Sequence, residues 1–183
     1  MRFVVLALLA GCGVQIGGES TPVDSASDTQ NQVDAAIDSP PARPCTAGNK
    51  NMVVGNECLM LFTGTPSSWA DANTACTSIQ SHLAIIDTAA KHTAAKALVG
   101  ATDAWIGLTD LAVEGQYRWV DTTVPFAFSM WNVNEPSNGG GTYEEDCTVI
   151  AGLTNREWDD RPCSPAVTGV PAGCCQYSYL CQF

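Results

Sequence analysis

From residue 45 onward, the sequence predicts a single α+β domain held together by disulfide bonds. Short strand-like runs come first, two helical segments follow, and further strand-like runs surround a long irregular loop, an order typical of α+β folds. Eight cysteines lie in this part of the chain, and an even cysteine count in an exported protein indicates a disulfide framework. The stretch from Asp110 to Asp160, which contains this loop, is rich in carboxylates, which indicates a cation site.

The first elements follow from apolar patterning. Residues 51–64 (NMVVGNECLMLFTG) contain two short apolar runs broken by Gly and Asn, which predicts a β-hairpin. Residues 65–80 predict a helix that Ser67 or Ser68 can cap at its N-terminus. The apolar residues that recur at helical spacing on one face of it are Trp69, Ala72, Cys76 and Ile79.

The later elements are a second helix and several short strands. Residues 81–86 (SHLAII) predict a strand, and the Ala-rich residues 87–100 predict a helix with Asp87 as N-cap and Gly100 as its stop. Further strand-like runs are AWIGLTD (104–110), GQYRWVD (115–121), CTVIAG (147–152), REWDD (156–160) and YSYLCQF (177–183). The tryptophans in this part (Trp105, Trp119, Trp131 and Trp158) are expected in the core.

Residues 126–141 show little periodicity and contain repeated Pro, Asn and Gly, which predicts a long loop. A loop of this length in a small domain is usually functional or held by something else. Of the 14 acidic residues from Cys45 onward, ten fall between Asp110 and Asp160, against two arginines. Carboxylates crowded in this way need a cation, and oxygen ligands with Asn and Gly favour calcium over a transition metal.

Composition excludes several function classes. The formal charge of −11 with only 8 basic residues argues against a nucleic-acid partner, because phosphate binding needs clustered Lys and Arg. Zinc is excluded because CxxC pairs and His ligands at metal spacing are absent, so His82 and His92 are assigned structural or surface roles. Neither an HExxH nor a GxSxG motif occurs.

The N-terminus predicts an exported, lipid-anchored protein. The apolar run of residues 3–9 is too short to span a bilayer, which takes roughly 18–20 residues. It leads directly into Leu-Ala-Gly-Cys, which resembles a bacterial lipobox, so residues 1–12 are expected to be a lipoprotein signal peptide with lipid on Cys12. Gly13 favours sorting to the outer membrane, on either face. Residues 13–44 predict a disordered acidic tether.

Four motifs in order resemble those of C-type lectin domains. They are WIGLTD (105–110), NEPS with EEDC (134–147), WDDRPC (158–163) and the terminal YLCQF (179–183). The resemblance covers residues 45–183. It implies the C-type lectin fold, with two helices, short antiparallel sheets and a long loop braced by calcium and stapled by disulfides.

The resemblance also implies the cysteine pairing. It joins Cys76 to Cys181 and Cys147 to Cys163, while the early pair Cys45–Cys58 closes an N-terminal hairpin. The interval before Cys181 is longer than the family's and contains Cys174 and Cys175. These two can form a vicinal bridge, or one can pair with Cys147 and the other with Cys163.

Two calcium sites are implied, residue by residue. The sugar-site ion would be held by Glu135, Ser137, Glu145, Asp159 and Asp160, with Pro136 in the place of the family's cis proline. The auxiliary ion would be held by Asp110, Glu114, Asn138 and Asp146. The sugar itself would bind Glu135, Ser137, Glu145 and Asp159, while Glu144 and Glu157 are assigned to solvent.

Two substitutions separate this chain from the family pattern. Ser137 and Asp159 each stand where the family has Asn, so two N–H₂ donors for sugar hydroxyls are missing. The glycines at 139–141 also lengthen the path from Glu135 to Glu145. Two functions therefore remain: calcium-dependent carbohydrate binding, of mannose type because Glu135 is not Gln, and a calcium-braced module for protein or surface adhesion. Enzyme activity is not expected, because crowded carboxylates suit a metal better than a glycosidase acid–base pair.

Overall fold

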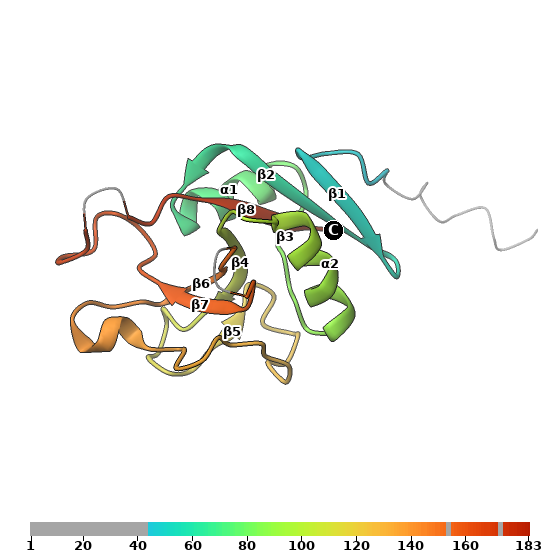
Figure 1. Cartoon of the computed structure of the whole chain (residues 1–183). Coiled ribbons are helices and arrows are strands. Elements are labelled where there is room, and N and C mark those ends of the chain that lie inside the picture. Colours follow the sequence, from blue (N-terminus) through green and yellow to red (C-terminus); the bar gives the residue numbers. More distant parts are fainter. Residues whose placement is uncertain (1–43, 153–154, 172–173) are drawn as a thin grey trace, which may run out of the picture. The chain divides into compact units, whose positions relative to one another are not determined.

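The computed structural model describes residues 44–152, 155–171 and 174–183 of the 183-residue chain (Figure 1). The expected signal peptide, Cys12 and nearly all of the expected tether fall within residues 1–43, outside the described residues. None of the helices in the described part has the length and apolar character needed to cross a membrane.

The described residues form one sheet flanked by two helices, so the α+β prediction is confirmed (Figure 1). The sheet has eight strands, in the order β1-β2-β8-β4-β6-β7, with β3 paired to β8 and β5 to β4. They are β1 (Lys50–Val54), β2 (Glu57–Ser67), β3 (His82–Leu83), β4 (Ala104–Thr109), β5 (Arg118–Trp119), β6 (Cys147–Ile150), β7 (Trp158–Arg161) and β8 (Tyr177–Gln182). The pairing is antiparallel except between β4 and β8, which run parallel.

The first helix, α1 (Trp69–Ser78), begins as predicted. The Ser68 side chain accepts a hydrogen bond from the Asp71 N–H, which identifies Ser68 rather than Ser67 as its N-cap. The predicted strand at 81–86 is shorter than expected, because only β3 pairs regularly. Beyond it, Ile85 N–H donates to the Gln182 side chain at 2.8 Å instead of to a strand backbone.

The second helix, α2 (Ala89–Val99), has a different cap from the one predicted. Thr88, not Asp87, is the N-cap, and its hydroxyl accepts from the Lys91 N–H at 3.3 Å. The Asp87 carboxylate instead pairs with Lys91 Nζ at 2.8 Å. Gly100 ends the helix as predicted, with a φ of 66° that suits glycine.

Two hydrophobic clusters make up the core. One lies between α2 and the sheet and contains Trp119 and Trp158; the other lies against α1 and contains Trp69 and Trp105. Trp131 packs only partly buried against the first cluster. The expected core role is therefore confirmed for Trp105, Trp119 and Trp158, whereas Trp131 lies at the edge of the core.

The eight cysteines of the described residues form four disulfides. They are Cys45–Cys58, Cys76–Cys181, Cys147–Cys163 and the vicinal pair Cys174–Cys175. The first three are the pairs that the family resemblance implies. The fourth resolves the open question in favour of the vicinal bridge, so Cys163 alone links the segment between β7 and β8 to Cys147.

Candidate cation and ligand site

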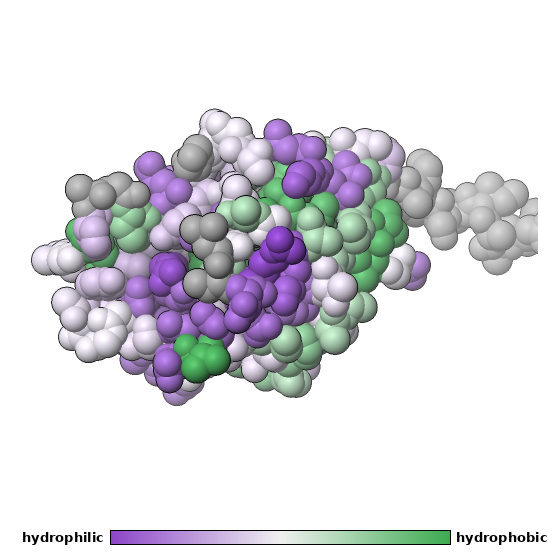
Figure 2. All heavy atoms as spheres, in the orientation of Figure 1, coloured by the Kyte–Doolittle hydropathy of each residue, from purple (hydrophilic) through white to green (hydrophobic). Residues whose placement is uncertain are grey.

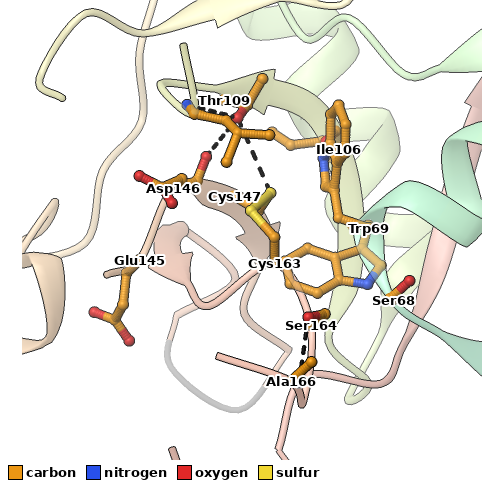
Figure 3. The surroundings of a disulfide bond; sticks show 12 residues. Ser68, Trp69, Ile106, Thr109, Glu145, Asp146, Cys147, Cys163, Ser164 and Ala166 are labelled. Atoms are coloured by element: carbon orange, nitrogen blue, oxygen red, sulfur yellow. Dashed lines mark hydrogen bonds between the residues drawn. A yellow bond between two sulfur atoms is a disulfide. The ribbon is translucent and has the colours of Figure 1, made fainter. Parts of the chain in front are cut away.

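The acidic segment is fixed to the sheet at the start of β6. The Cys147–Cys163 disulfide lies beside the indole of Trp69, whose backbone N–H donates to the Cys163 carbonyl at 3.0 Å (Figure 3). The Thr109 hydroxyl donates to the Asp146 carbonyl at 2.6 Å. Figure 3 shows the Asp146 carboxylate on the far side of the disulfide from Trp69, so the bridge separates apolar packing from acidic surface.

Three carboxylates meet where the long loop reaches β7. Glu135, Asp159 and Asp160 each offer an oxygen, and these oxygens all lie within 4.8 Å of one another. The Glu135–Pro136 bond is cis, as the resemblance implies. Glu135 Oε2 is buried without a hydrogen-bond partner among the described residues. A buried acceptor left without a donor, beside two more carboxylates, fits the oxygen ligands that calcium prefers.

Asp160 organises the loop as well as contributing to the cluster. Its carboxylate is fully buried, and its two oxygens accept from the Ser137 N–H at 2.9 Å and the Asn138 N–H at 2.7 Å. Each carboxylate oxygen has a second lone pair, so these bonds leave room for a cation. The segment after Pro136 is thus held by the same side chain that would hold the ion.

Asp159 has a partner that the sequence analysis did not anticipate. Arg161 Nη1 and Nη2 donate to Asp159 Oδ1 and Oδ2 at 2.8 and 2.7 Å, a bidentate pair. The two residues are two apart on β7 and therefore point to the same face, which was the available signal. Burial raises the pKa of Asp159 to about 7, with Arg161 opposing that effect. Any cation here shares Asp159 with a guanidinium.

Glu145 and Ser137 lie beside the three-carboxylate cluster, outside that group. Glu145 Oε2 accepts from the Gly139 N–H at 2.5 Å and lies 3.4 Å from the Ser137 hydroxyl. The Glu145 N–H in turn donates to Asn138 Oδ1 at 2.8 Å. Both predicted residues therefore face the same loop. Glu145 is buried, and because its Oε2 makes both of these contacts, its Oε1 is the oxygen that could reach an ion.

The glycine insertion builds a specific turn. Residues Asn138–Gly141 form a short 3₁₀ segment, η1, in which Gly139 has a φ of 58° and Gly140 a φ of 60°. A Cβ on Gly139 would lie 2.9 Å from the Tyr143 ring, so the backbone passes too close for any side chain. This turn directs the Gly139 N–H at Glu145, which explains why the insertion consists of glycine.

A second acidic group comprises Glu114, Glu144 and Asp146, whose oxygens also lie within 4.8 Å of one another. Glu144 is exposed, as predicted, and its carboxylate also belongs to this group. In an extended run, residues 144 and 146 face one side and residue 145 the other, so the Glu-Glu-Asp sequence carried the signal. Glu157, the other residue expected in solvent, is only half-exposed, and its Oε1 lies 3.5 Å from Lys96 Nζ.

Two predicted auxiliary ligands support this second cluster from its edge. Asp110 Oδ2 accepts from the Gly115 N–H at 2.8 Å, while its Oδ1 is buried without a partner among the described residues. Asn138 Nδ2 donates to Glu144 Oε2 at 3.2 Å. The buried, unpartnered Oδ1 fits a cation here too, and Asn138 links the two acidic clusters.

Five carboxyls in or beside the two clusters are held above their ordinary pKa values. Burial is the first cause for each, and neighbouring carboxylates add to it. The affected groups are Asp110, Glu135, Glu145 and Asp146, together with Asp159. Such crowding disfavours the charged forms, and a bound cation would relieve it.

Calcium is therefore expected to stabilise the protein more at pH 8 than at pH 5. A carboxyl with a raised pKa keeps its proton to a higher pH, and proton and cation compete for the same oxygens. Without a cation, the fold loses stability as pH rises from about 4, the unfolded value, towards the Asp159 value of about 7. Thermal unfolding with calcium chloride and with EDTA at both pH values measures the difference. An equal or larger calcium shift at pH 5 would contradict it.

Residues 65–168 match the family model of the lectin C-type domain, which is more than half of the chain. The chain belongs to the C-type lectin domain family. It is 34% identical over 122 residues to the chicken hepatic lectin, covering 66% of this chain and 57% of that protein. It is 38% identical over 104 residues to human C-type lectin domain family 17 member A, covering 56% and 26%. The C-type lectin domain thus spans about half of the first relative's length and less of the second's.

Solved C-type lectin structures share the fold. The cow CD23 carbohydrate-recognition domain, solved in the presence of a GlcNAc2Man3 oligosaccharide, superposes with a TM-score of 0.61 at 23% identity, covering 75% of this chain and 95% of that one. The C-type lectin domain of murine dendritic cell inhibitory receptor 2, solved with an N-glycan, superposes with a TM-score of 0.61 at 22% identity, covering 75% of this chain and 98% of that one. A calcium-independent type II antifreeze protein superposes with a TM-score of 0.59 at 24% identity, covering 75% of this chain and 94% of that one. The predicted fold and family are confirmed.

Proposed function

We propose that this C-type lectin domain binds carbohydrate through a calcium ion held by Glu135, Asp159 and Asp160. The observation that carries the proposal is their convergence from the long loop and from β7, with a buried oxygen of Glu135 that no donor of the described residues reaches. A calcium ion there would supply coordination for two neighbouring sugar hydroxyls. Carbohydrate-binding relatives of the same fold support this reading.

The protein's own side chains would orient the sugar. The free oxygens of Glu135 and Glu145 can accept hydrogen bonds from sugar hydroxyls, and the Ser137 hydroxyl can donate or accept one. Arg161 also contacts the Tyr177 side chain, and its remaining N–H donors would partly replace the amide donors that the family has at residues 137 and 159. Glu135 in place of Gln favours mannose-type over galactose-type sugars.

The second cluster would hold a bracing cation. Glu114, Glu144 and Asp146 supply carboxylates, and the unpartnered oxygen of Asp110 lies at its edge. Because Asn138 contacts both clusters, neutralising the second would help to hold the loop that presents Glu135. The domain would act as a binding module without catalysis.

The location proposed from the N-terminal sequence is the outer membrane. A lipid on Cys12 would anchor the protein, because acyl chains contribute about 0.8 kcal/mol per buried CH₂. Residues 13–44 would then hold the domain away from the lipid surface, where a lectin could reach glycans or mediate adhesion.

Calorimetry of the full chain tests the proposal in two steps. Calcium is titrated first, and α-methyl mannoside and α-methyl galactoside follow in calcium and in EDTA. Heat from mannoside only with calcium is expected, and Glu135→Gln should reduce it while favouring the galactoside. Glu114→Gln, a matched change in the second cluster, should weaken calcium binding without altering the sugar preference. Sugar heat in EDTA would refute the calcium-dependent mechanism.

A specific observation favours a second candidate, a calcium-braced adhesion module that binds no sugar. Arg161 occupies both oxygens of Asp159, so Asp159 has less capacity for an ion and for sugar hydroxyls than the Asn it replaces. This candidate would be selected if calorimetry gave heat of calcium binding but no heat of binding for either glycoside.

A further inference from the structure

A cavity of about 410 Å³ lies along α2, apart from both acidic clusters. One wall is formed by Ala89, Thr93 and Ala97, which are exposed and follow one another at four-residue spacing on the helix. Their small side chains leave the space open. Met130 lines it from the loop. On the face shown in Figure 2, hydrophilic side chains gather beside the paler surface that α2 presents.

The floor of the cavity is rigid and uncharged. His92 lines the cavity and is 4% exposed, and its ring packs 6.4 Å from Phe128 and 6.1 Å from Trp158, centroid to centroid. Burial lowers the pKa of His92, so the ring is neutral at pH 7. Above this floor, the apolar side chains of Ala89, Ala97 and Met130 offer a surface for the body of a small molecule.

The rim of the cavity is positive, in a chain whose net charge is −11. Arg156 is exposed on a backbone with a φ of 60°, and no carboxylate of the described residues forms an ion pair with it. Among the described residues, Lys96 forms one ion pair, between its Nζ and Glu157 Oε1 at 3.5 Å. Two cations against one carboxylate leave donors for an anion, and a guanidinium can bind a carboxylate or sulfate with two parallel hydrogen bonds.

We infer that this cavity binds a small organic anion, a single carboxylate or sulfate on a ring-sized apolar body. The anion would lie between Arg156 and Lys96, and the ring would lie against Met130 and the Ala97 wall. The cavity volume falls in the range of known small-molecule sites, roughly 300–1,000 Å³. An aromatic acid and the sugar ring of an acidic saccharide share this chemistry. The site does not depend on calcium.

Amide NMR of the full chain in EDTA tests the inference, because chelation removes any contribution from the acidic clusters. Phenyl sulfate and glucose 6-sulfate are titrated, with inorganic sulfate and glucose as matched probes that lack the ring or the charge. Shifts are expected at the amides of Ala89–Ala97 and Arg156 with at least one organic sulfate. Phenyl sulfate alone would identify an aromatic acid as the ligand, and glucose 6-sulfate alone an acidic sugar.

Two kinds of variant separate charge from shape. The double change Lys96→Gln with Arg156→Gln should weaken binding at least about ten-fold, and Ala97→Leu should also weaken it by filling the cavity while leaving the charge intact. Arg118→Gln, an exposed arginine outside the cavity, is the control and should change nothing. Equal shifts from inorganic sulfate, unaltered binding in the double variant, or no shift with any probe would each overturn the inference.

Discussion

Asp160→Asn is expected to weaken calcium binding by at least about 100-fold and to lower the stability of the fold. One carboxylate oxygen becomes an N–H₂ group that faces the Ser137 or Asn138 N–H, so two donors meet at a buried site. A buried polar group left without its partner costs about 1–3 kcal/mol. The cluster also loses one of its three carboxylates. Calorimetry with calcium and thermal unfolding in EDTA measure the two effects separately.

The control for this prediction is Asp121→Asn. Asp121 is exposed, and among the described residues its carboxylate accepts hydrogen bonds only from Thr123, so the charge change is the same without a cation cluster. That variant should keep its calcium affinity within about two-fold, since exposed charges are screened by salt. Retained calcium binding in Asp160→Asn would show that the ion does not lie at this cluster.

The sequence predicted the elements whose signals are local. The hairpin, both helices, the Ser68 cap and the Gly100 stop depend on residues within a turn of one another, and the structure contains them. Strand pairing that depends on distant segments could not be predicted from the sequence. The predicted strand at 81–86 became two residues of β3, because its neighbours β8 and β4 supply isolated hydrogen bonds rather than a ladder.

In the candidate site, too, the residues with local signals were predicted, and the contacts that depend on the folded chain were not. The acidic residues were identified from type and order, because carboxylates next to Asn and Gly indicate calcium wherever they occur. Arg161 was missed because a single arginine after two aspartates has no meaning until the strand places it beside Asp159. The exposure of Glu144 was predicted, and the 144/146 alternation placed it on the side of Asp146, but its approach to Glu114 depends on the folded loop.

Removing the Cys76–Cys181 disulfide by a double change to alanine is expected to be the most destabilising alteration of the cysteine framework. Both cysteines are fully buried, and the bridge links α1 to β8 across a sequence separation of 105 residues. In the chain-entropy model, releasing a loop of that length costs about 5 kcal/mol, against about 3 kcal/mol for the Cys45–Cys58 separation of 13. The total free energy of unfolding of a native domain is only about 5–15 kcal/mol.

Thermal unfolding of the three double-alanine variants, each measured without reductant, ranks the bridges. The Cys76–Cys181 variant should melt about 10–20 °C lower than the parent protein, and the Cys45–Cys58 variant should lose less. The vicinal pair Cys174–Cys175 closes no loop, so its removal should leave the melting temperature nearly unchanged except for lost packing of the buried Cys175. If the vicinal variant lost as much as the long-range one, loop closure would not explain how this framework stabilises the domain. The residues that position β8 against α1 would then have to act through native packing instead.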